Sequence, residues 1–272
     1  MPAVLETTLS AVPETSQHQF HRRWDHLQDR HVRALAWLLD APDLLDAQAA
    51  RWHGKIATLN CDRETVCTWL KTLDHDPAAL HAFLLLPGTT RLGRYAEKLM
   101  AWYFGWCGNL VAHGLQVQAG RTDTIGEFDF LLREGDCLVH YEFATKFYLF
   151  EVLERDDGDP AGSFLGPNLA DTLDAKMQKI LLRQLALAQH PAAQKYLPQS
   201  VTRAQALIKG WLFYHEEIGT SPVAPGVAAA HCRGWHGWHR HVRRPPMFLI
   251  GPAWPRISLR ISPAIRCRCW WR

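Results

Sequence analysis

Apolar positions in the first third of the chain follow the spacing of amphipathic helices. In residues 24–39 they have helical spacing, and the run DAPD at 40–43 ends the pattern. The apolar positions of this first helix are Leu27, Val32, Leu35, Leu38 and Leu39. Similar spacing predicts helices at about 62–73, 77–85 and 91–106. We therefore expect an all-helical beginning.

The pattern changes to short alternating runs after residue 106. Residues 110–118 alternate as a strand does, and two longer runs follow at about 126–132 and 137–150. The segment REGD between them places Gly135 in a turn. These features predict one strand and then a β-hairpin.

A helix and a further strand are expected after the hairpin. Residues 168–190 are amphipathic over a long stretch, with Asn168 or Asp171 as the N-cap, and residues 204–215 are typical of a strand. Strands that run together and are then joined through a helix are typical of an α/β fold with a mixed sheet.

Composition divides the chain into four parts. The 272 residues suffice for one substantial domain with a smaller addition. The polar residues 1–20 are expected to be disordered, 21–90 form a helical N-terminal part, 91–217 form the core, and 218–272 form a basic tail.

The net charge of +3 conceals a strongly basic tail. Residues 1–217 carry 21 Lys and Arg against 27 Asp and Glu, whereas the tail has nine Arg and no Lys, Asp or Glu. A tail of this charge is suited to binding nucleic acid by displacing counterions from phosphates. An alternative stays open, because the Arg-, Trp- and Pro-rich residues 245–272 also resemble an out-of-frame translation.

Two further features of composition bear on location and metals. There is no run of about 20 apolar residues, no signal-peptide pattern and no CxxC pair among the seven cysteines, so we expect a cytoplasmic protein without membrane contact. Several tail residues are weak zinc candidates whose spacing matches no established zinc pattern. They are His231, Cys232, His236, His239 and His241.

Charged residues interrupt both apolar strands of the expected hairpin. Alternation places Glu127 and Asp129 on one face of the first strand, and Glu142 and Lys146 on one face of the second. Carboxylates that lie close together repel one another unless a cation neutralises them. Mg²⁺ binds carboxylates together with phosphate, and a lysine can orient the attacking water. The pattern therefore favours metal-assisted phosphodiester hydrolysis.

These residues resemble a known nuclease superfamily. GRYAEKLMAWYFGW, a strand, and then GEFDFLLREGDCLVHYEFATK are similar to the core of PD-(D/E)XK nucleases, nearest to Holliday-junction-resolvase-like members, over about 91–150. The chain from about 25 to 240 also resembles an uncharacterised bacterial family, a domain of unknown function. The resemblance implies a restriction-endonuclease-like mixed sheet flanked by helices, with a helical N-terminal extension, and DNA as the substrate.

The resemblance also implies roles for particular residues, with Mg²⁺ or Mn²⁺ as the cofactor. The implied catalytic residues are Asp129, Glu142 and Lys146, the implied metal ligands are Asp129, Glu142, Glu97 and Glu127, and the supporting residues are Lys176 and Gln184. Cleavage at chain ends or within DNA stays open, as does assembly into a homodimer.

The chain departs from the superfamily pattern at one point. Three residues separate Glu142 from Lys146 instead of one, and Ala144 occupies the usual acidic position. In a regular strand the pair would be roughly 13 Å apart instead of about 7 Å. Either a β-bulge brings the two together, or Glu127 or Glu97 supplies the missing ligand, or the fold is kept only for binding DNA.

Other interpretations of the same residues also stay open. Glu127 and Asp129 fit the polar face of an ordinary edge strand, and Glu142 and Lys146 fit a structural ion pair. A protein of another class, whose helical N-terminal third binds a partner chain, is the third hypothesis.

Overall fold

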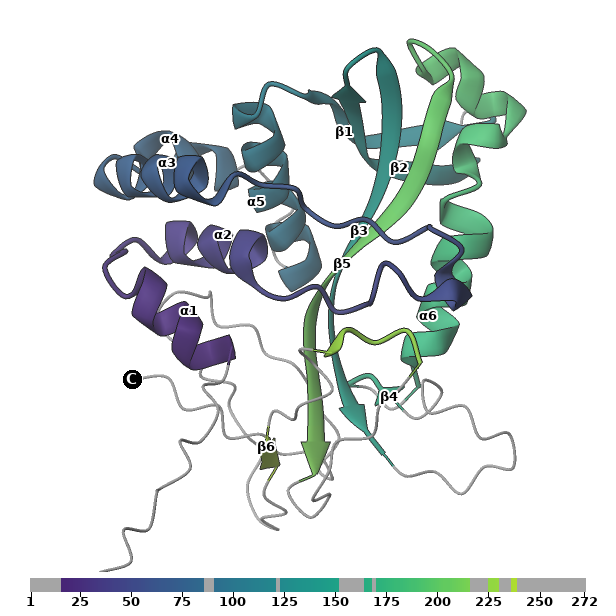
Figure 1. Ribbon diagram of the computed structural model, residues 1–272. Coiled ribbons are helices and arrows are strands. Elements are labelled where there is room, and N and C mark those ends of the chain that lie inside the picture. The colour runs from purple at the N-terminus through teal and green to yellow at the C-terminus, as the bar shows by residue number, and fades with distance from the viewer. Residues whose placement is uncertain are drawn as a thin grey trace, which may run out of the picture.

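A mixed β-sheet covered by helices on both faces forms the centre of the molecule (Figure 1). The computed structural model describes residues 16–85, 91–120, 123–151, 164–167, 170–215, 225–229 and 236–238. The α/β class and the mixed sheet expected from the sequence are confirmed in this part of the chain. None of the described helices is long and apolar enough to cross a membrane.

The helices in chain order are α1 (Ser16–Trp24), α2 (Arg30–Asp40), the 3-10 helix η1 (Ala50–Trp52), α3 (Arg63–His75), α4 (Ala78–Leu84), α5 (Leu92–Trp106), α6 (Leu173–Lys179), the π-helical turn η3 (Ile180–Gln184) and the 3-10 helices η4 (Leu187–Gln189) and η5 (Pro191–Tyr196). The helices expected at about 62–73, 77–85 and 91–106 are confirmed, whereas the helix expected at 24–39 begins only at Arg30, because residues 25–29 separate it from α1. Residues 16–20, expected to be disordered, are helical instead; residues 1–15 lie outside the described part of the chain.

The strands are β1 (Leu110–Gln118), β2 (Thr124–Glu134), β3 (Cys137–Phe150), β4 (Phe164–Leu165), β5 (Val201–His215) and β6 (His236–Trp238). Among the described residues their order is β1-β2-β3-β5-β6, and β4 pairs with β3. The pairs β1–β2, β2–β3 and β3–β4 are antiparallel, whereas β3–β5 and β5–β6 are parallel. The expected hairpin is therefore present as β2 and β3, at the middle of the sheet.

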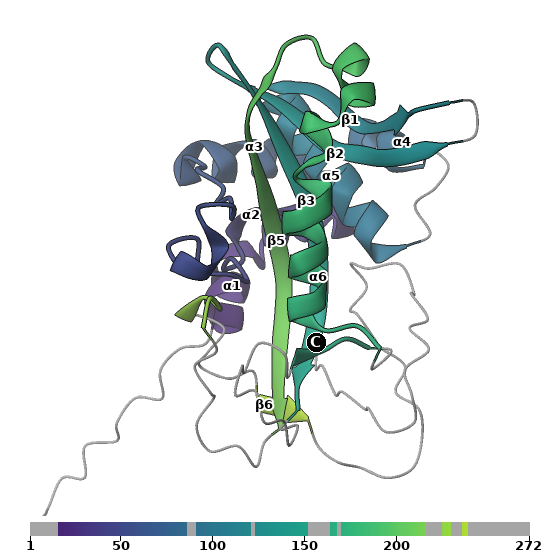
Figure 2. The same cartoon turned by 90° about the vertical axis from the view of Figure 1, so that its right-hand side faces the viewer.

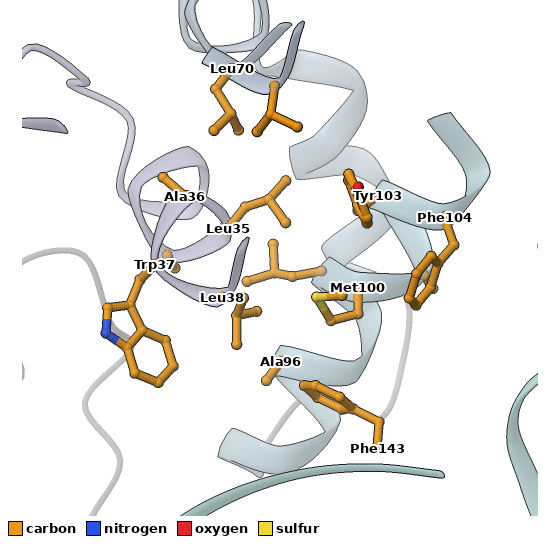
Figure 3. Close-up of a cluster of buried hydrophobic side chains, with 14 of the residues drawn as sticks. Leu35, Ala36, Trp37, Leu38, Leu70, Ala96, Met100, Tyr103, Phe104 and Phe143 are labelled. Atoms are coloured by element: carbon orange, nitrogen blue, oxygen red, sulfur yellow. The ribbon is translucent and has the colours of Figure 1, made fainter. Parts of the chain in front are cut away.

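The larger core lies between one face of the sheet and the N-terminal helices. Figure 3 shows Leu35 and Leu38 of α2 directed at Ala96 and Met100 of α5, with Phe143 of β3 beneath them. These side chains are all buried, because the helices place their apolar positions three or four residues apart toward the sheet. Helix α5 is therefore held between the other helices and the strands.

Helix α6 covers the opposite face of the sheet. Leu173, Met177 and Ile180 are buried in one cluster with Ala144 and Tyr148 of β3. Because both faces of β3 are covered, its sequence is a nearly continuous apolar run, as in a strand buried on both sides.

The long helix expected at 168–190 is divided in the structure. The α-helical part is short, and a hydrogen bond from Leu185 N to Ile180 O, spanning five residues, marks the π turn that follows. The N-cap is Thr172, whose Oγ1 accepts a hydrogen bond from Ala175 N, so Asp171 is not the cap. Asn168, the other expected cap, lies outside the described residues.

The N-terminal part and the core are joined through β5. Ala57 N donates to Ala206 O at 2.9 Å, and Ala206 N donates to Lys55 O at 2.7 Å. The buried ammonium of Lys209 lies 2.7 Å from the Asp43 carboxylate. The segment after α2, residues 41–57, therefore runs beside β5.

Candidate metal centre

The sheet forks in the middle of the β2–β3 hairpin. Among the described residues, ladder pairing of β2 with β3 runs from Glu134 and Cys137 to Phe130 and Tyr141. Beyond that point β2 continues with β1, while β3 continues with β5, and Figure 2 shows the two pairs diverging. We call this place the fork, formed by Asp129, Glu142 and Phe143.

The side chain of Asp129 occupies the place where the ladder stops. Its Oδ2 accepts a hydrogen bond from Phe143 N at 2.9 Å. A backbone N–H left by the diverging strand is thereby satisfied, as buried backbone groups require. The carboxylate is fixed at the fork by the backbone.

Strict alternation of faces along β2 was a wrong expectation. Phe128 packs in a cluster with Leu131, whereas Phe130 belongs to the core on the α5 side. The change of face occurs around Asp129. Opposite it in β1 stands Gly114, whose φ of 61° lies in the left-handed region that glycine adopts without strain. This local twist explains how Glu127 and Glu97 come to lie together.

Three carboxylates meet on the α5 side of the fork. Glu97 of α5, Glu127 and Asp129 each offer an oxygen, and these oxygens all lie within 4.8 Å of one another. His113 Nε2 lies 3.2 Å from a Glu97 oxygen, and Gln116 donates to Glu127 at 3.3 Å. Oxygens bound to one Mg²⁺ at about 2.1 Å are about 3.0–4.2 Å apart, so small side-chain rotations would complete the site. The residues fit a hard divalent cation.

Glu142 joins this group from β3. Burial raises the pKa of Asp129 to about 8, and the charges of Glu142 and Glu97 act in the same direction, against the hydrogen bond from Phe143 N. Burial also raises the pKa of Glu142 to about 7, which the charge of Lys176 partly offsets. Asp129 and Glu142 interact directly and titrate as a pair. A bound cation would relieve this repulsion.

Lys176 and Gln184 reach Glu142 from the α6 side. Gln184 Nε2 donates to Glu142 Oε1, and Lys176 Nζ donates to Gln184 Oε1 at 3.3 Å. Burial lowers the pKa of Lys176, and the neighbouring ammonium groups of Lys146 and Lys179 lower it further. Both residues expected to support the site therefore lie beside it.

The π turn explains why Lys176 and Gln184 share a face. In a continuous α-helix, residues eight apart point in directions about 80° different. A π turn holds more residues than an α turn, and it brings Gln184 back over Lys176. Such turns often occur at functional sites.

Lys146 is the expected site residue that the structure places differently. Its Nζ donates to Asp171 Oδ2 at 3.3 Å, so Lys146 is paired with Asp171 and not with Glu142. The register of β3 with β5 runs unbroken past both Glu142 and Lys146, and the hypothesis of a β-bulge between them is wrong. The strands approach so closely here that a Cβ on Gly210 would lie 1.8 Å from the Lys146 carbonyl oxygen.

A buried histidine that is not among the predicted site residues lies beside Glu142. His140 is fully buried, and its Nε2 is 3.7 Å from Glu142 Oε2. Burial lowers the pKa of His140 to about 4, which keeps the imidazole neutral at pH 7. Its position two residues before Glu142 on a strand places it on the same face, and this spacing could have indicated it.

Most of the residues in the zinc hypothesis for the tail lie outside the part of the chain that the structure describes. His236 begins β6. His231, Cys232, His239 and His241 lie outside the described residues.

One comparison with known proteins identifies the family. Residues 33–248 match the model of DUF1853, described as a domain of unknown function. The match includes residues 218–248 of the basic tail. No curated protein and no solved structure matches the chain. The matched segment covers more than half of the sequence, and the chain therefore belongs to the DUF1853 family.

Proposed function

We propose that this protein is a divalent-metal-dependent nuclease that hydrolyses phosphodiester bonds of DNA. The observation that supports the proposal is the group of Glu97, Glu127 and Asp129, with oxygens within 4.8 Å of one another, next to Glu142 and the half-buried Lys176. Carboxylates that gather despite mutual repulsion are suited to a cation, and a cation with an ammonium group is suited to phosphate.

DNA as the substrate rests on the resemblance of residues 91–150 to PD-(D/E)XK nucleases. A mixed sheet with helices on both faces is compatible with the restriction-endonuclease-like arrangement that this resemblance implies. We include that arrangement in the proposal.

The side chains at the fork have separate roles in this proposal. Glu97, Glu127 and Asp129 hold the ion, which when bound supplies Lewis acidity and lowers the pKa of a water molecule. Glu142, oriented by Gln184, accepts a hydrogen bond from the attacking water. Lys176 stabilises the negative charge that develops on the phosphate.

Lys176 takes the role that the resemblance assigned to Lys146. The charge of Lys176 acts on Glu142 and on Asp129, whereas Lys146 is paired with Asp171. An ammonium group on α6 therefore serves the fork in place of one on β3.

A nuclease-fold protein that binds DNA without cutting it is the second candidate. The position of Lys146 favours it, because the regular strand keeps Lys146 four residues from Glu142 without a bulge. In this case the carboxylates would keep only a structural or metal-binding role.

Cleavage assays with purified protein distinguish the two candidates. We expect plasmid, single-stranded or four-way-junction DNA to be cut with Mg²⁺ or Mn²⁺ and to stay intact in EDTA. Asp129→Ala and Glu97→Gln should lower the rate by about 100-fold or more, because each removes a ligand. The matched control is Asp136→Asn, which neutralises an exposed carboxylate in the turn of the same hairpin.

Each outcome of the assay has one meaning. DNA affinity that persists without metal-dependent cleavage would support the second candidate. If no DNA is cut or bound, and Asp129→Ala leaves metal binding unchanged, both candidates are wrong and the partner-binding hypothesis gains support.

A further inference from the structure

Three polar atoms on the α6 side of the fork are buried without a partner. They are Nδ1 and Nε2 of His140 and Oε2 of Glu142, for which the described residues provide no hydrogen bond. His140 is 0% exposed and Glu142 is 2% exposed. Buried polar atoms are paired in the great majority of cases, because an unpaired one loses its hydrogen bonds to water without replacement. The pair therefore indicates a ligand.

We propose that His140 and Glu142 bind a divalent ion on the α6 side of the fork, and that the imidazole selects a first-row transition metal over Mg²⁺. This inference rests on the proposed function, because Glu142 and Asp129 of the site described above would also bind this ion. It extends that function by a nitrogen ligand and a metal preference, neither of which the resemblance to nucleases implies.

The distance between the two side chains is suitable for a shared ion. Ligand atoms about 2.1 Å from one ion are about 3.0 Å apart when adjacent in an octahedron and about 4.2 Å apart when opposite. The 3.7 Å between His140 Nε2 and Glu142 Oε2 lies within this range. Asp129, which interacts directly with Glu142, is placed to supply a third ligand.

The surroundings hold both ligands in position. Gln184 donates to the other oxygen of Glu142, as partners of ligating carboxylates commonly do. The ring of Phe128 stands at 87° to the His140 ring with the centroids 4.8 Å apart, which restricts rotation of the imidazole. The free oxygen and the ring nitrogen therefore stay directed at each other.

The chemistry of the pair gives the metal preference. Carboxylate oxygens suit Mg²⁺, Ca²⁺ and Mn²⁺, whereas an imidazole nitrogen favours ions such as Mn²⁺, Co²⁺ and Zn²⁺ over Mg²⁺. A neutral imidazole has a lone pair to donate. We therefore expect Mn²⁺ and Co²⁺ to bind more tightly than Mg²⁺.

Pulsed electron paramagnetic resonance of bound Mn²⁺ tests the nitrogen ligand in the full-length protein. We expect modulation from an imidazole ¹⁴N nucleus in the wild type, and its replacement by the ¹⁵N pattern when histidine is ¹⁵N-labelled. This labelling experiment needs no substitution and so does not depend on the folding of a variant.

Two substitutions assign the nitrogen. His140→Leu and His140→Gln should each abolish the modulation and weaken Co²⁺ binding by about 10- to 100-fold, while Mg²⁺ binding changes little. The matched control is His113→Leu, which removes the other imidazole near the carboxylates, 3.2 Å from Glu97. It should leave the modulation unchanged.

The results also separate this inference from the proposed function. If the His140 variants keep the modulation, or if His113→Leu abolishes it, the assignment to His140 is wrong. Mn²⁺ bound without nitrogen modulation, in a protein that still cuts DNA, would overturn this inference and leave the nuclease proposal standing. If the wild type binds no divalent ion, both are wrong.

Discussion

The two ends of the β2–β3 hairpin differ in what their side chains do. From Phe130 and Tyr141 to the turn, the strands form a regular ladder and bury apolar side chains. At the fork the ladder stops, and burial holds the pKa values of Asp129 and Glu142 above their usual range. The ladder near the turn stabilises the fold, whereas the carboxylates gathered at the fork destabilise it.

The largest expected effect on stability belongs to the regular ladder between the turn of the hairpin and Phe130. Phe130→Ala should lower the free energy of unfolding by about 3–5 kcal/mol, because Phe130 is fully buried against Phe104 and Phe143. Urea unfolding measures the change, and Arg133→Ala, on an exposed side chain of the same strand, should stay within about 0.5 kcal/mol. A cost below about 1 kcal/mol for Phe130→Ala would contradict the comparison.

At the fork, a substitution should change the free energy of unfolding in the opposite direction. Asp129→Asn should raise the free energy of unfolding at pH 8 in EDTA by about 1–2 kcal/mol, because it removes a partly buried charge and keeps an acceptor for Phe143 N. A loss of stability would show that the carboxylate is needed by the fold itself.

The pH dependence of stability checks the cause of that gain. The pKa values of Asp129 and Glu142 are about 8 and about 7 in the folded protein, above their ordinary values of 3.8 and 4.5, so the folded state holds protons that the unfolded state has released. The stability that these two carboxyl groups contribute is therefore lost as the pH rises through their pKa values in the folded protein. His140, with a folded pKa of about 4 and an ordinary value of 6.5, acts oppositely only below about pH 6.5.

The clear window is therefore pH 6.5 to 8. We expect the free energy of unfolding of the wild type to fall across it, and Asp129→Asn to show a shallower slope, in urea titrations with EDTA. Equal slopes for the two proteins would refute the assignment to these carboxyls.

The smallest expected effect lies just beyond the fork. Lys146→Met removes a partly exposed ion pair with Asp171, so stability should change by no more than about 1 kcal/mol. DNA cleavage should fall far less than in Lys176→Met, measured on the same substrate. If Lys146→Met abolishes cleavage and Lys176→Met does not, the superfamily assignment of the lysine is the better one.

Local periodicity was sufficient to predict most elements of the fold. The strands at 110–118 and 137–150 coincide with β1 and β3, because alternation and turn residues act over a few neighbours. Glu127 and Asp129 could be found in the same way, since a charge inside an apolar strand is costly and conspicuous, whereas Glu97, on a helix, was indicated only by the resemblance to nucleases. Glu97, Glu127 and Asp129 are close together in the structure, as expected.

The arrangement around those carboxylates could not be predicted, because it depends on contacts between distant parts of the chain. The fork arises where β3 loses its pairing with β2 while it stays paired with β5, and no residue within β3 marks that point. Gly114 inside a strand pattern was a signal for a twist. The π turn, which places Lys176 and Gln184 over Glu142, has no comparable signal in the sequence.

Helix α5 gives the fork a mechanical link to the N-terminal helices. The hydroxyl of Tyr95 lies 2.7 Å from His31 Nδ1 of α2, and Glu97 follows only two residues later on the same rigid rod. The position of Glu97 relative to Asp129 therefore depends on how α5 packs against α2. Helix packing in the N-terminal third of the chain thus contributes to the geometry of the acidic group formed by Glu97, Glu127 and Asp129.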